Sequence, residues 1–492
     1  MQIVACPSCG AQVEFKSHAS VVAVCEYCRA TVMKDADAVK DLGKMSAVLE
    51  DFTRIQIGTA GTLAGRGFTV VGRIQLKYSA GMWNEWYLLF DDAGAGWLGD
   101  SSGLYTVTTE IALAGEAAGA LPAFDEIAVG RRYNINDGRF TAAEKRTAAC
   151  IGGQGELPFK VGPGWEARVV DLRDSAAFIT LDYSDADKGA APVLYKGVAT
   201  TLEDMQCQLL RDDDVIKAAA GRYRGKVEAL DCPSCGSAIK YLPGVTTSLV
   251  CPSCQAVLDA AGPQAQILAK SDNVEKVRTT LPLGATAKIN NVDWQLIGAM
   301  RRVDDEGSGW TEYLLYNARG GFFWLVETDE GWSRSNVMPV WPAWSSIDAD
   351  HADLDKVSYN KLYAYPATVT WAAGAFNWRV AAGDVVQVVE FQSGQTRLAA
   401  ERTAEELTWS RSTPVAVDQL RGWFGNALRS DPLHKIPAQK PPSRGAATRF
   451  ALWILGLNAI PLLFNFWGTI FWVGLAIFAV YWAENFFDAK GS

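Results

Sequence analysis

The sequence predicts a mainly β fold: two zinc ribbons, each followed by an antiparallel β-sandwich or barrel-like domain, and a C-terminal transmembrane helix. Three observations predict it. Eight of the ten cysteines form two matched sets, short strand-like segments recur between turns, and the stretch from Phe450 to Ala483 holds no charged residue. Many short strands with few helical stretches are typical of antiparallel sheets.

Both cysteine sets read C-x2-C-x15-C-x2-C, and an offset of 226 residues separates them. Such pairs suit tetrahedral Zn²⁺, because one tight turn presents two sulfurs to the same ion. A redox C-x-x-C pair is the alternative, but redox motifs do not usually come as two matched pairs. We therefore expect two structural zinc ions. Their ligands are Cys6, Cys9, Cys25 and Cys28 in the first set, and Cys232, Cys235, Cys251 and Cys254 in the second.

The repeat continues beyond the cysteines. The same offset pairs Tyr87-Leu88-Leu89 with Tyr313-Leu314-Leu315, and an offset near 219 pairs GELPFKVGPGWEARVVDL with GAFNWRVAAGDVVQVVEF. A repeat of this kind sets the architecture, so the chain reads as two copies of one unit. The expected parts are a zinc ribbon (1–35), a β-rich domain (50–211), a helical linker (212–227), a second ribbon (228–262), a second β-rich domain (277–430), a basic Pro-rich linker (431–449) and a transmembrane segment (450–484).

Strands are expected where short β-branched and aromatic segments lie between Gly, Asp and Asn clusters. They include FTVVGRIQL, EWYLLF, YTVTTEIAL and ARVVDL in the first copy, and WQLIGAMRRV, TEYLLYN, FFWLVET and VVQVVEF in the second. Two helices are expected, at 36–49 and 212–223, the second of them led by acidic residues.

Composition excludes several classes of protein. The 18 Trp, 15 Tyr and 20 Phe among 492 residues are too many for a disordered chain. A pI near 5.1 gives no general attraction to phosphate, which argues against an electrostatic nucleic-acid binder. The chain has three histidines, too few to favour a catalytic metal site held by several histidines.

The stretch IQIGTAGTLAGRGFTVVGRIQLKYSAGMWNEWYLLF, from Ile55 to Phe90, resembles bacterial proteins of domain-of-unknown-function family 4178. The second copy, LPLGATAKINNVDWQLIGAMRRVDDEGSGWTEYLLYN, is similar but more divergent, with GAMR in place of GRIQ. The resemblance implies zinc ribbons ahead of the β domains. It also implies a context of bacterial operons with membrane-stress proteins related to phage-shock protein A and polyamine-synthase-like enzymes. It implies no catalytic residues.

Two Trp-x-Glu pairs are candidate ligand-binding residues: Trp83 with Glu85, and Trp310 with Glu312. Aligned on the YLL motif, the pairs are displaced by one residue. A carboxylate beside aromatic rings could bind a cation, including a polyamine, by charge and cation–π attraction. The alternative is that the tryptophans belong to the core and the glutamate closes a structural ion pair with Arg73 or a turn.

The sequence GDSSG at 99–103 matches the nucleophile-elbow pattern G-x-S-x-G. That motif requires a following helix, whereas LYTVTTEI reads as a strand, so we expect a β-turn. Cys150 and Cys207 lie outside the repeat and are expected to be ordinary buried thiols.

The uncharged C-terminal stretch is long enough for one membrane span, which we expect at roughly Leu462 to Trp482; a tight hairpin is the alternative. The preceding linker carries Lys and Arg, which the positive-inside rule places on the cytoplasmic side, beside anionic lipid. Zinc thiolates likewise indicate a reducing compartment. The expected location is the bacterial inner membrane, with the soluble domains in the cytoplasm.

These features favour a membrane-anchored, non-enzymatic binding or scaffold protein in a membrane-stress or polyamine-linked system. The expected contacts are membrane lipid and an unidentified protein partner. One alternative is an enzyme, or an enzyme subunit, acting on polyamine- or lipid-related substrates. The other is nucleic-acid binding through the ribbons, for which Lys16, Arg29 and Lys34 are too few.

Overall fold

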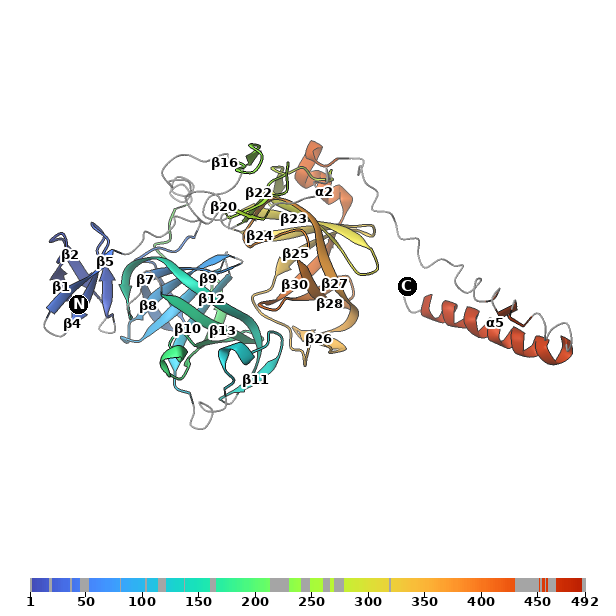
Figure 1. The fold of residues 1–492 in the computed structure, drawn as a ribbon, viewed down its shortest axis with the longest axis horizontal. Coiled ribbons are helices and arrows are strands. Elements are labelled where there is room, and N and C mark those ends of the chain that lie inside the picture. Colours follow the sequence, from blue (N-terminus) through green and yellow to red (C-terminus); the bar gives the residue numbers. More distant parts are fainter. Residues whose placement is uncertain are drawn as a thin grey trace. The chain divides into compact units, whose positions relative to one another are not determined.

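The computed structural model describes two units, residues 1–433 and 434–492, which are treated separately (Figure 1). The described residues are 2–16, 20–35, 38–44, 53–79, 81–101, 104–113, 121–136, 138–159, 165–212, 230–239, 248–259, 266–269, 278–317, 320–429, 451, 454–455, 457–458 and 466–488.

In the first copy, eight antiparallel strands form a closed ring. The sheet order runs β12-β13-β14-β15-β10-β9-β8-β7, and β12 also pairs with β7, so the path returns to its start. The strands are β7 (Arg66–Lys77), β8 (Met82–Phe90), β9 (Ala95–Ser101), β10 (Leu104–Ile111), β12 (Gly138–Leu157), β13 (Glu166–Asp174), β14 (Ala177–Asp182) and β15 (Val193–Thr200). β6 (Ala60–Leu63) pairs with β7, and β11 (Arg132–Ile135) pairs with β12.

The second copy has the same topology. Its order is β27-β28-β29-β30-β25-β24-β23-β22, and β27 also pairs with β22. The strands are β22 (Val292–Val303), β23 (Gly309–Asn317), β24 (Gly321–Thr328), β25 (Gly331–Val337), β27 (Val357–Phe376), β28 (Val385–Ser393), β29 (Thr396–Arg402) and β30 (Leu407–Val415), with β21 (Thr286–Ile289) and β26 (His351–Leu354) beside them. The predicted duplication and the predicted antiparallel sheets are confirmed.

Each cysteine set lies on a small ribbon ahead of its ring. One hairpin of the ribbon stands alone, and a second joins the sheet of the ring through the long strand β12 or β27. The ribbon strands are β1 (Gln2–Ala5), β2 (Gln12–Phe15), β3 (Val22–Val24), β4 (Ala30–Asp35) and β5 (Ala38–Lys44), then β16 (Leu230–Asp231), β17 (Ala238–Ile239), β18 (Ser248–Val250), β19 (Val257–Asp259) and β20 (Gln266–Ala269).

The prediction of a helix at 36–49 is wrong. Residues 38–44 form strand β5, which pairs with β4 and sets Val39 opposite Lys34 and Lys40 opposite Met33. The neighbouring strand satisfies the backbone groups of this segment, and that tertiary pairing outweighs its local helical preference. The other predicted helix, 212–223, lies outside the described residues except for Asp212.

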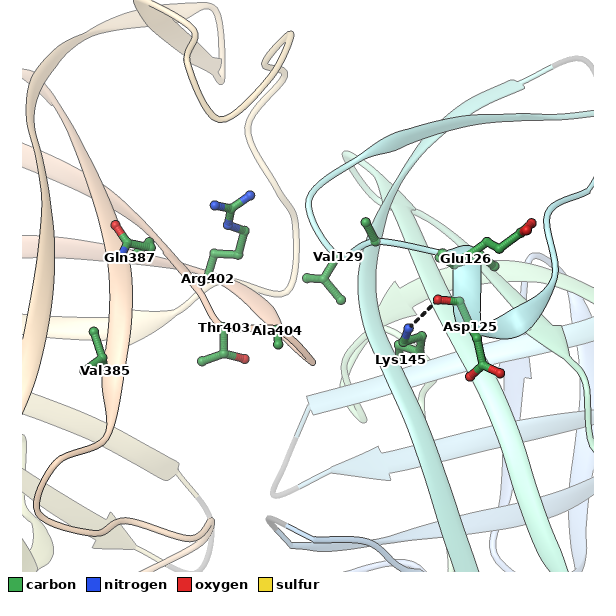
Figure 2. A pocket seen from close by; sticks show the side chains of 11 residues that line it. Asp125, Glu126, Val129, Lys145, Val385, Gln387, Arg402, Thr403 and Ala404 are labelled. Atoms are coloured by element: carbon green, nitrogen blue, oxygen red, sulfur yellow. Dashed lines mark hydrogen bonds between the residues drawn. The ribbon is translucent and has the colours of Figure 1, made fainter.

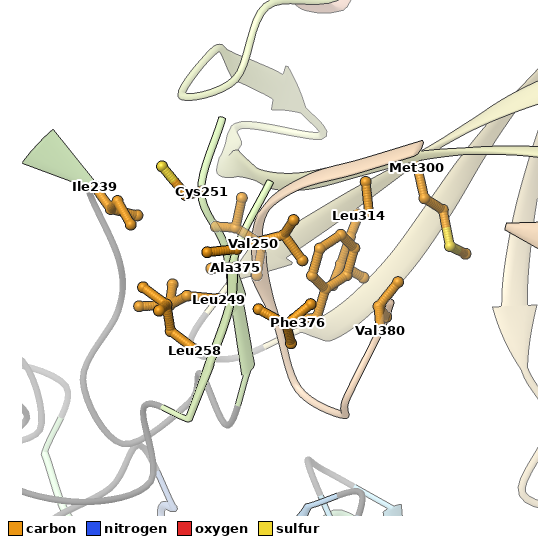
Figure 3. Close-up of a cluster of buried hydrophobic side chains, with 14 of the residues drawn as sticks. Ile239, Leu249, Val250, Cys251, Leu258, Met300, Leu314, Ala375, Phe376 and Val380 are labelled. Atoms are coloured by element: carbon orange, nitrogen blue, oxygen red, sulfur yellow. The ribbon is translucent and has the colours of Figure 1, made fainter. Parts of the chain in front are cut away.

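The apolar core of the second copy runs from the ribbon into the ring. Leu249, Val250 and Cys251 of the ribbon belong to the same buried cluster as Leu314 and Phe376 of the ring, as Figure 3 shows. In the first copy, Val22 and Val24 of the ribbon likewise share a cluster with ring residues, while most of the ribbon packs in a second cluster around Phe15 and Val32. Both ribbons are therefore joined to their rings through a shared apolar core.

Within the first unit, the two copies contact each other. The backbone N–H of Lys145 donates to the carbonyl of Glu405 at 2.9 Å, and the guanidinium of Arg173 lies 5.5 Å from the ring centre of Trp341. A recess of about 540 Å³ lies where residues of both copies meet (Figure 2). Lys145 and Arg402 face it together with Asp125 and Glu126, so its lining favours no single sign of ligand charge.

Helices are few among the described residues. Val417–Phe424 forms α2, which buries Leu420 and Phe424 against the second copy, and Phe466–Asp488 forms α5. Short 3₁₀ turns occupy Phe124–Glu126, Ala186–Lys188 and Gly425–Ala427. In the part of the chain that the structure describes, no helix meets the length and apolarity needed to cross a membrane. The predicted transmembrane helix is thus not confirmed.

Candidate metal centres

Each ribbon brings its four cysteines together on two tight turns. In the first ribbon, the β1–β2 turn carries Cys6 and Cys9, and the β3–β4 turn carries Cys25 and Cys28. A backbone hydrogen bond closes each turn: Gly10 N–H donates to the Cys6 carbonyl, and Arg29 N–H to the Cys25 carbonyl, both at 2.8 Å. The second ribbon repeats these bonds at 2.7 Å and 2.8 Å. All four turns therefore present their thiols in the same way.

The sulfur–sulfur distances fit a tetrahedral ion. Sγ of Cys6 lies 3.6 Å from that of Cys28, and Sγ of Cys9 lies 3.7 Å from that of Cys25. The matching distances in the second ribbon are 3.7 Å and 3.8 Å. Metal–sulfur bonds of about 2.3 Å at tetrahedral angles place the sulfurs about 3.8 Å apart, whereas a disulfide would need about 2.05 Å. Two four-cysteine groups that could hold metal ions are thus present.

Burial and local hydrogen bonds divide the thiols of each site. Cys6 and Cys25 are buried and Cys9 is exposed, and the same holds for Cys232, Cys251 and Cys235. The backbone N–H of Ala30 lowers the pKa of Cys28 to about 6. Hydrogen bonds from Ser237 lower the pKa of Cys235 to about 6. Against a hydrogen bond from the backbone of Ala11, neighbouring thiols raise the pKa of Cys9 to about 12, and burial raises that of Cys251 to about 12. The contacts therefore favour the thiolate, the metal-binding form, at one ligand of each ribbon and not at all four.

The two Trp-x-Glu pairs have the same geometry. The indole N–H of Trp83 donates to Oε1 of Glu85 at 2.7 Å, and that of Trp310 donates to Oε1 of Glu312 at 2.7 Å. Their one-residue displacement in the sequence has a structural reason. The bulges lie at equivalent residues, Val71 and Ile297, but five residues join β22 to β23 where four join β7 to β8, so every residue of β23 is shifted by one place.

With this shift, the two glutamates lie opposite equivalent residues. Glu85 lies opposite Ile74, and Glu312 lies opposite Met300, which is 226 residues after Ile74. The glutamates, and not the YLL motifs, therefore occupy equivalent places in the two rings.

Glu85 is half-buried, with a desolvated carboxyl group. Burial raises its pKa from the ordinary 4.5 to about 8; Asp171 adds to the rise, while Trp83 and Arg146 oppose it. Strands β8 and β13 are not neighbours in the ring, so the interaction between Glu85 and Asp171 runs across its inside. The Arg146 guanidinium lies 5.0 Å from the ring centre of Trp83 and pairs with Glu144. The protein's own arginine thus takes the cation–π position on this tryptophan.

Glu312 faces a different partner. Burial raises its pKa, and the Arg302 guanidinium opposes the rise from 3.4 Å away. Arg302 also pairs with Glu401 at 2.9 Å. Because β22 and β29 are not neighbours, this second ion pair also spans the inside of the ring.

Arg73 contacts Asn84 and Trp86. Its guanidinium donates to Oδ1 of Asn84 at 3.0 Å and 2.7 Å and stacks over Trp86, with 4.6 Å to the ring centre. These contacts do not support the alternative in which Arg73 pairs with the glutamate. Sequence reasoning missed Arg146 and Arg302, because each lies in a charged run within its strand, Glu144-Lys145-Arg146 and Arg301-Arg302, that reads as a solvated face.

The remaining candidates are the GDSSG motif and the two cysteines outside the ribbons. Gly99, Asp100 and Ser101 of GDSSG lie in β9, which pairs with the next strand β10, and residues 102–103 lie outside the described residues. Cys150 and Cys207 are half-buried, and burial raises the pKa of both thiols.

Two four-cysteine ribbons, each joined by strand pairing to a closed ring of antiparallel strands, define the class: a β protein with tandem four-cysteine ribbons. The chain belongs to the family described as domain of unknown function DUF4178, whose model matches residues 56–200 and 282–416. No curated protein and no solved structure matches the chain.

Proposed function

We propose that the chain is a non-enzymatic binding protein whose first ribbon contacts a partner protein. One observation carries the proposal: Tyr27, between the ligands Cys25 and Cys28, is 81% exposed. Tyrosine is enriched at interfaces, and an aromatic side chain held on a rigid turn loses little entropy on binding.

The second ribbon supplies a natural comparison. Its equivalent turn reads Cys251-Pro252-Ser253-Cys254, with Ser253 where the first ribbon has Tyr27. The two ribbons share their turn geometry, so the tyrosine is a difference in surface chemistry rather than in fold. We assign partner binding to the first ribbon and a structural role to the second.

Capture of the tagged full-length chain from cells that naturally produce it tests this proposal. Bound proteins are quantified by mass spectrometry for the wild type, Tyr27→Ser and the matched control Ser253→Ala. We expect at least one protein that Tyr27→Ser loses and Ser253→Ala retains. The same set of proteins with all three chains would contradict the proposal.

We propose Zn²⁺ as the metal in both ribbons. Four thiolates at tetrahedral separations are the donor set typical of structural zinc. A module of about 35 residues buries too little surface to fold alone, so the metal would supply folding free energy.

We also propose that the chain works at the cytoplasmic face of a bacterial inner membrane. The uncharged stretch 450–483 and the basic linker before it support attachment to anionic lipid. Fractionation of cells that produce the full chain or a chain ending at residue 430 tests this. We expect the full chain in the membrane fraction and the shorter one in the soluble fraction. A full chain that is soluble without detergent would contradict it.

A further inference from the structure

One glycine in each copy is the meeting point of three strands. Gly155 on β12 pairs with Gly72 of β7 on one side and with Val24 of β3 on the other. Gly374 on β27 pairs with Gly298 of β22 and with Val250 of β18 in the same way. Ring and ribbon are thus hydrogen-bonded to the same residue.

Only glycine fits this place. Gly155 has φ +71° and Gly374 has φ +98°. A Cβ atom at either would lie 2.3 Å from a backbone carbonyl oxygen, that of Val71 or Ile297. Because the backbones approach so closely here, the long strand can pair with two neighbours in turn. Up to the glycine, β12 or β27 pairs with β7 or β22 and closes the ring; from the glycine onward it pairs with β3 or β18 of the ribbon.

The metal ligands lie one residue away from these meeting points. Cys25 directly follows Val24, and Cys251 directly follows Val250. Each of these cysteines is buried, and its backbone N–H is bonded within the turn, to Ala30 at 2.9 Å and to Ala256 at 3.0 Å. A metal ion that fixes the sulfur therefore also fixes the strand that flanks the closure of the ring.

We infer that metal binding in each ribbon locks the closure of its ring at the seam, defined as 150–155 with 72–76 in the first copy and 368–374 with 298–303 in the second. The inference rests on the proposed metal sites. β3 and β18 are three residues long, too short to stay ordered without the metal-held turn beside them. Loss of the metal disorders β3 or β18, and the seam then lacks the ribbon strand that pairs with Gly155 or Gly374.

The two copies respond to different extents. In the first, the buried Glu156 next to Gly155 accepts hydrogen bonds from Lys16 N–H at 2.7 Å and Ser20 Oγ at 2.9 Å. These bonds tie ribbon to ring without the metal. In the second copy, Ala375 occupies the equivalent place and has no side-chain oxygen to accept such bonds. The second seam is the more sensitive to metal.

Hydrogen exchange of the full-length chain, read by mass spectrometry with and without a chelator, tests the inference. Exchange at the seams is compared with exchange at the pairs β10–β15 and β25–β30, which lie elsewhere in the rings. We expect metal removal to speed exchange at the second seam about tenfold, with a smaller change at the first and little at the comparison pairs. Added zinc should restore protection.

Variants give a second, independent measurement. Cys251→Ser should loosen the second seam and leave the first unchanged, and Cys25→Ser should do the reverse. Cys207→Ser, which removes a half-buried thiol outside the ribbons, should change neither. Unchanged seams after metal loss, or equal loosening of every strand pair, would overturn the inference. A chain that binds no metal at all would overturn the proposed zinc sites as well, and metal analysis distinguishes the two failures.

Discussion

The guanidinium of Arg302 lies 3.4 Å from the carboxylate of Glu312 inside the second ring. The first ring has Glu85 at the place of Glu312, but Leu76 at the place of Arg302. Two equivalent glutamates thus lie in different electrostatic surroundings, and their removal should have opposite effects on stability.

Glu85→Gln should stabilise the protein at neutral and alkaline pH. The folded-state pKa of about 8 is above the ordinary 4.5, so between these values the unfolded chain holds fewer protons and stability falls as pH rises. The slope is at most about 1.4 kcal/mol per pH unit. Glutamine keeps an oxygen for the Trp83 indole and carries no charge.

Urea unfolding at pH 5 and pH 8 measures this effect. We expect the wild type to lose more stability than Glu85→Gln between the two values. An equal loss in both proteins would contradict the assignment of a neutral, desolvated Glu85.

Glu312→Gln should destabilise the protein. Arg302 has a side chain only 7% exposed, and removal of one partner from a buried ion pair typically costs about 3–5 kcal/mol. Because Glu401 remains bound to Arg302, we expect roughly 2 kcal/mol in urea unfolding at pH 7. Glu330→Gln, which removes an exposed partner of Arg397, is the matched control and should cost under about 1 kcal/mol. A loss no larger than that of the control would argue against the pair.

Gly374→Ala should be more damaging than a change at an ordinary turn glycine. Gly189 also has a positive φ, +80°, but no atom lies within 4 Å of the Cβ that a substitution would add there. Gly189→Ala should therefore cost only the strain of the left-handed backbone, about 1–2 kcal/mol. Gly374→Ala adds a clash with the Ile297 carbonyl and should cost more than about 3 kcal/mol, as measured by thermal or urea unfolding. Similar losses of stability in Gly374→Ala and Gly189→Ala would contradict this expectation, because they would show that β27 and β22 can move apart at Gly374 without loss of stability.

The sequence was most informative where a pattern is local. Cysteine spacing predicts the two ribbons, because ligands two residues apart share one turn, and alternating apolar segments predict the strands. The segment 36–49 misled because its local preference is helical, while β4, its partner, decides the outcome.

The interiors of the rings could not be predicted in the same way. Arg302 and Glu401 are 99 residues apart in sequence, and their contact depends on the closure of the ring. The shift between the Trp-x-Glu pairs likewise depends on strand register, because β22 and β23 are joined by one residue more than β7 and β8, and residue types do not mark where these strands end.

We propose that two metal ions hold the ribbons and, through them, the rings. Native mass spectrometry of the full-length chain, purified under reducing conditions without added metal, counts these ions. We expect two zinc ions per chain, and one in Cys25→Ser and in Cys251→Ser. A wild-type chain with no bound metal, or with its ribbon cysteines joined as disulfides, would contradict it.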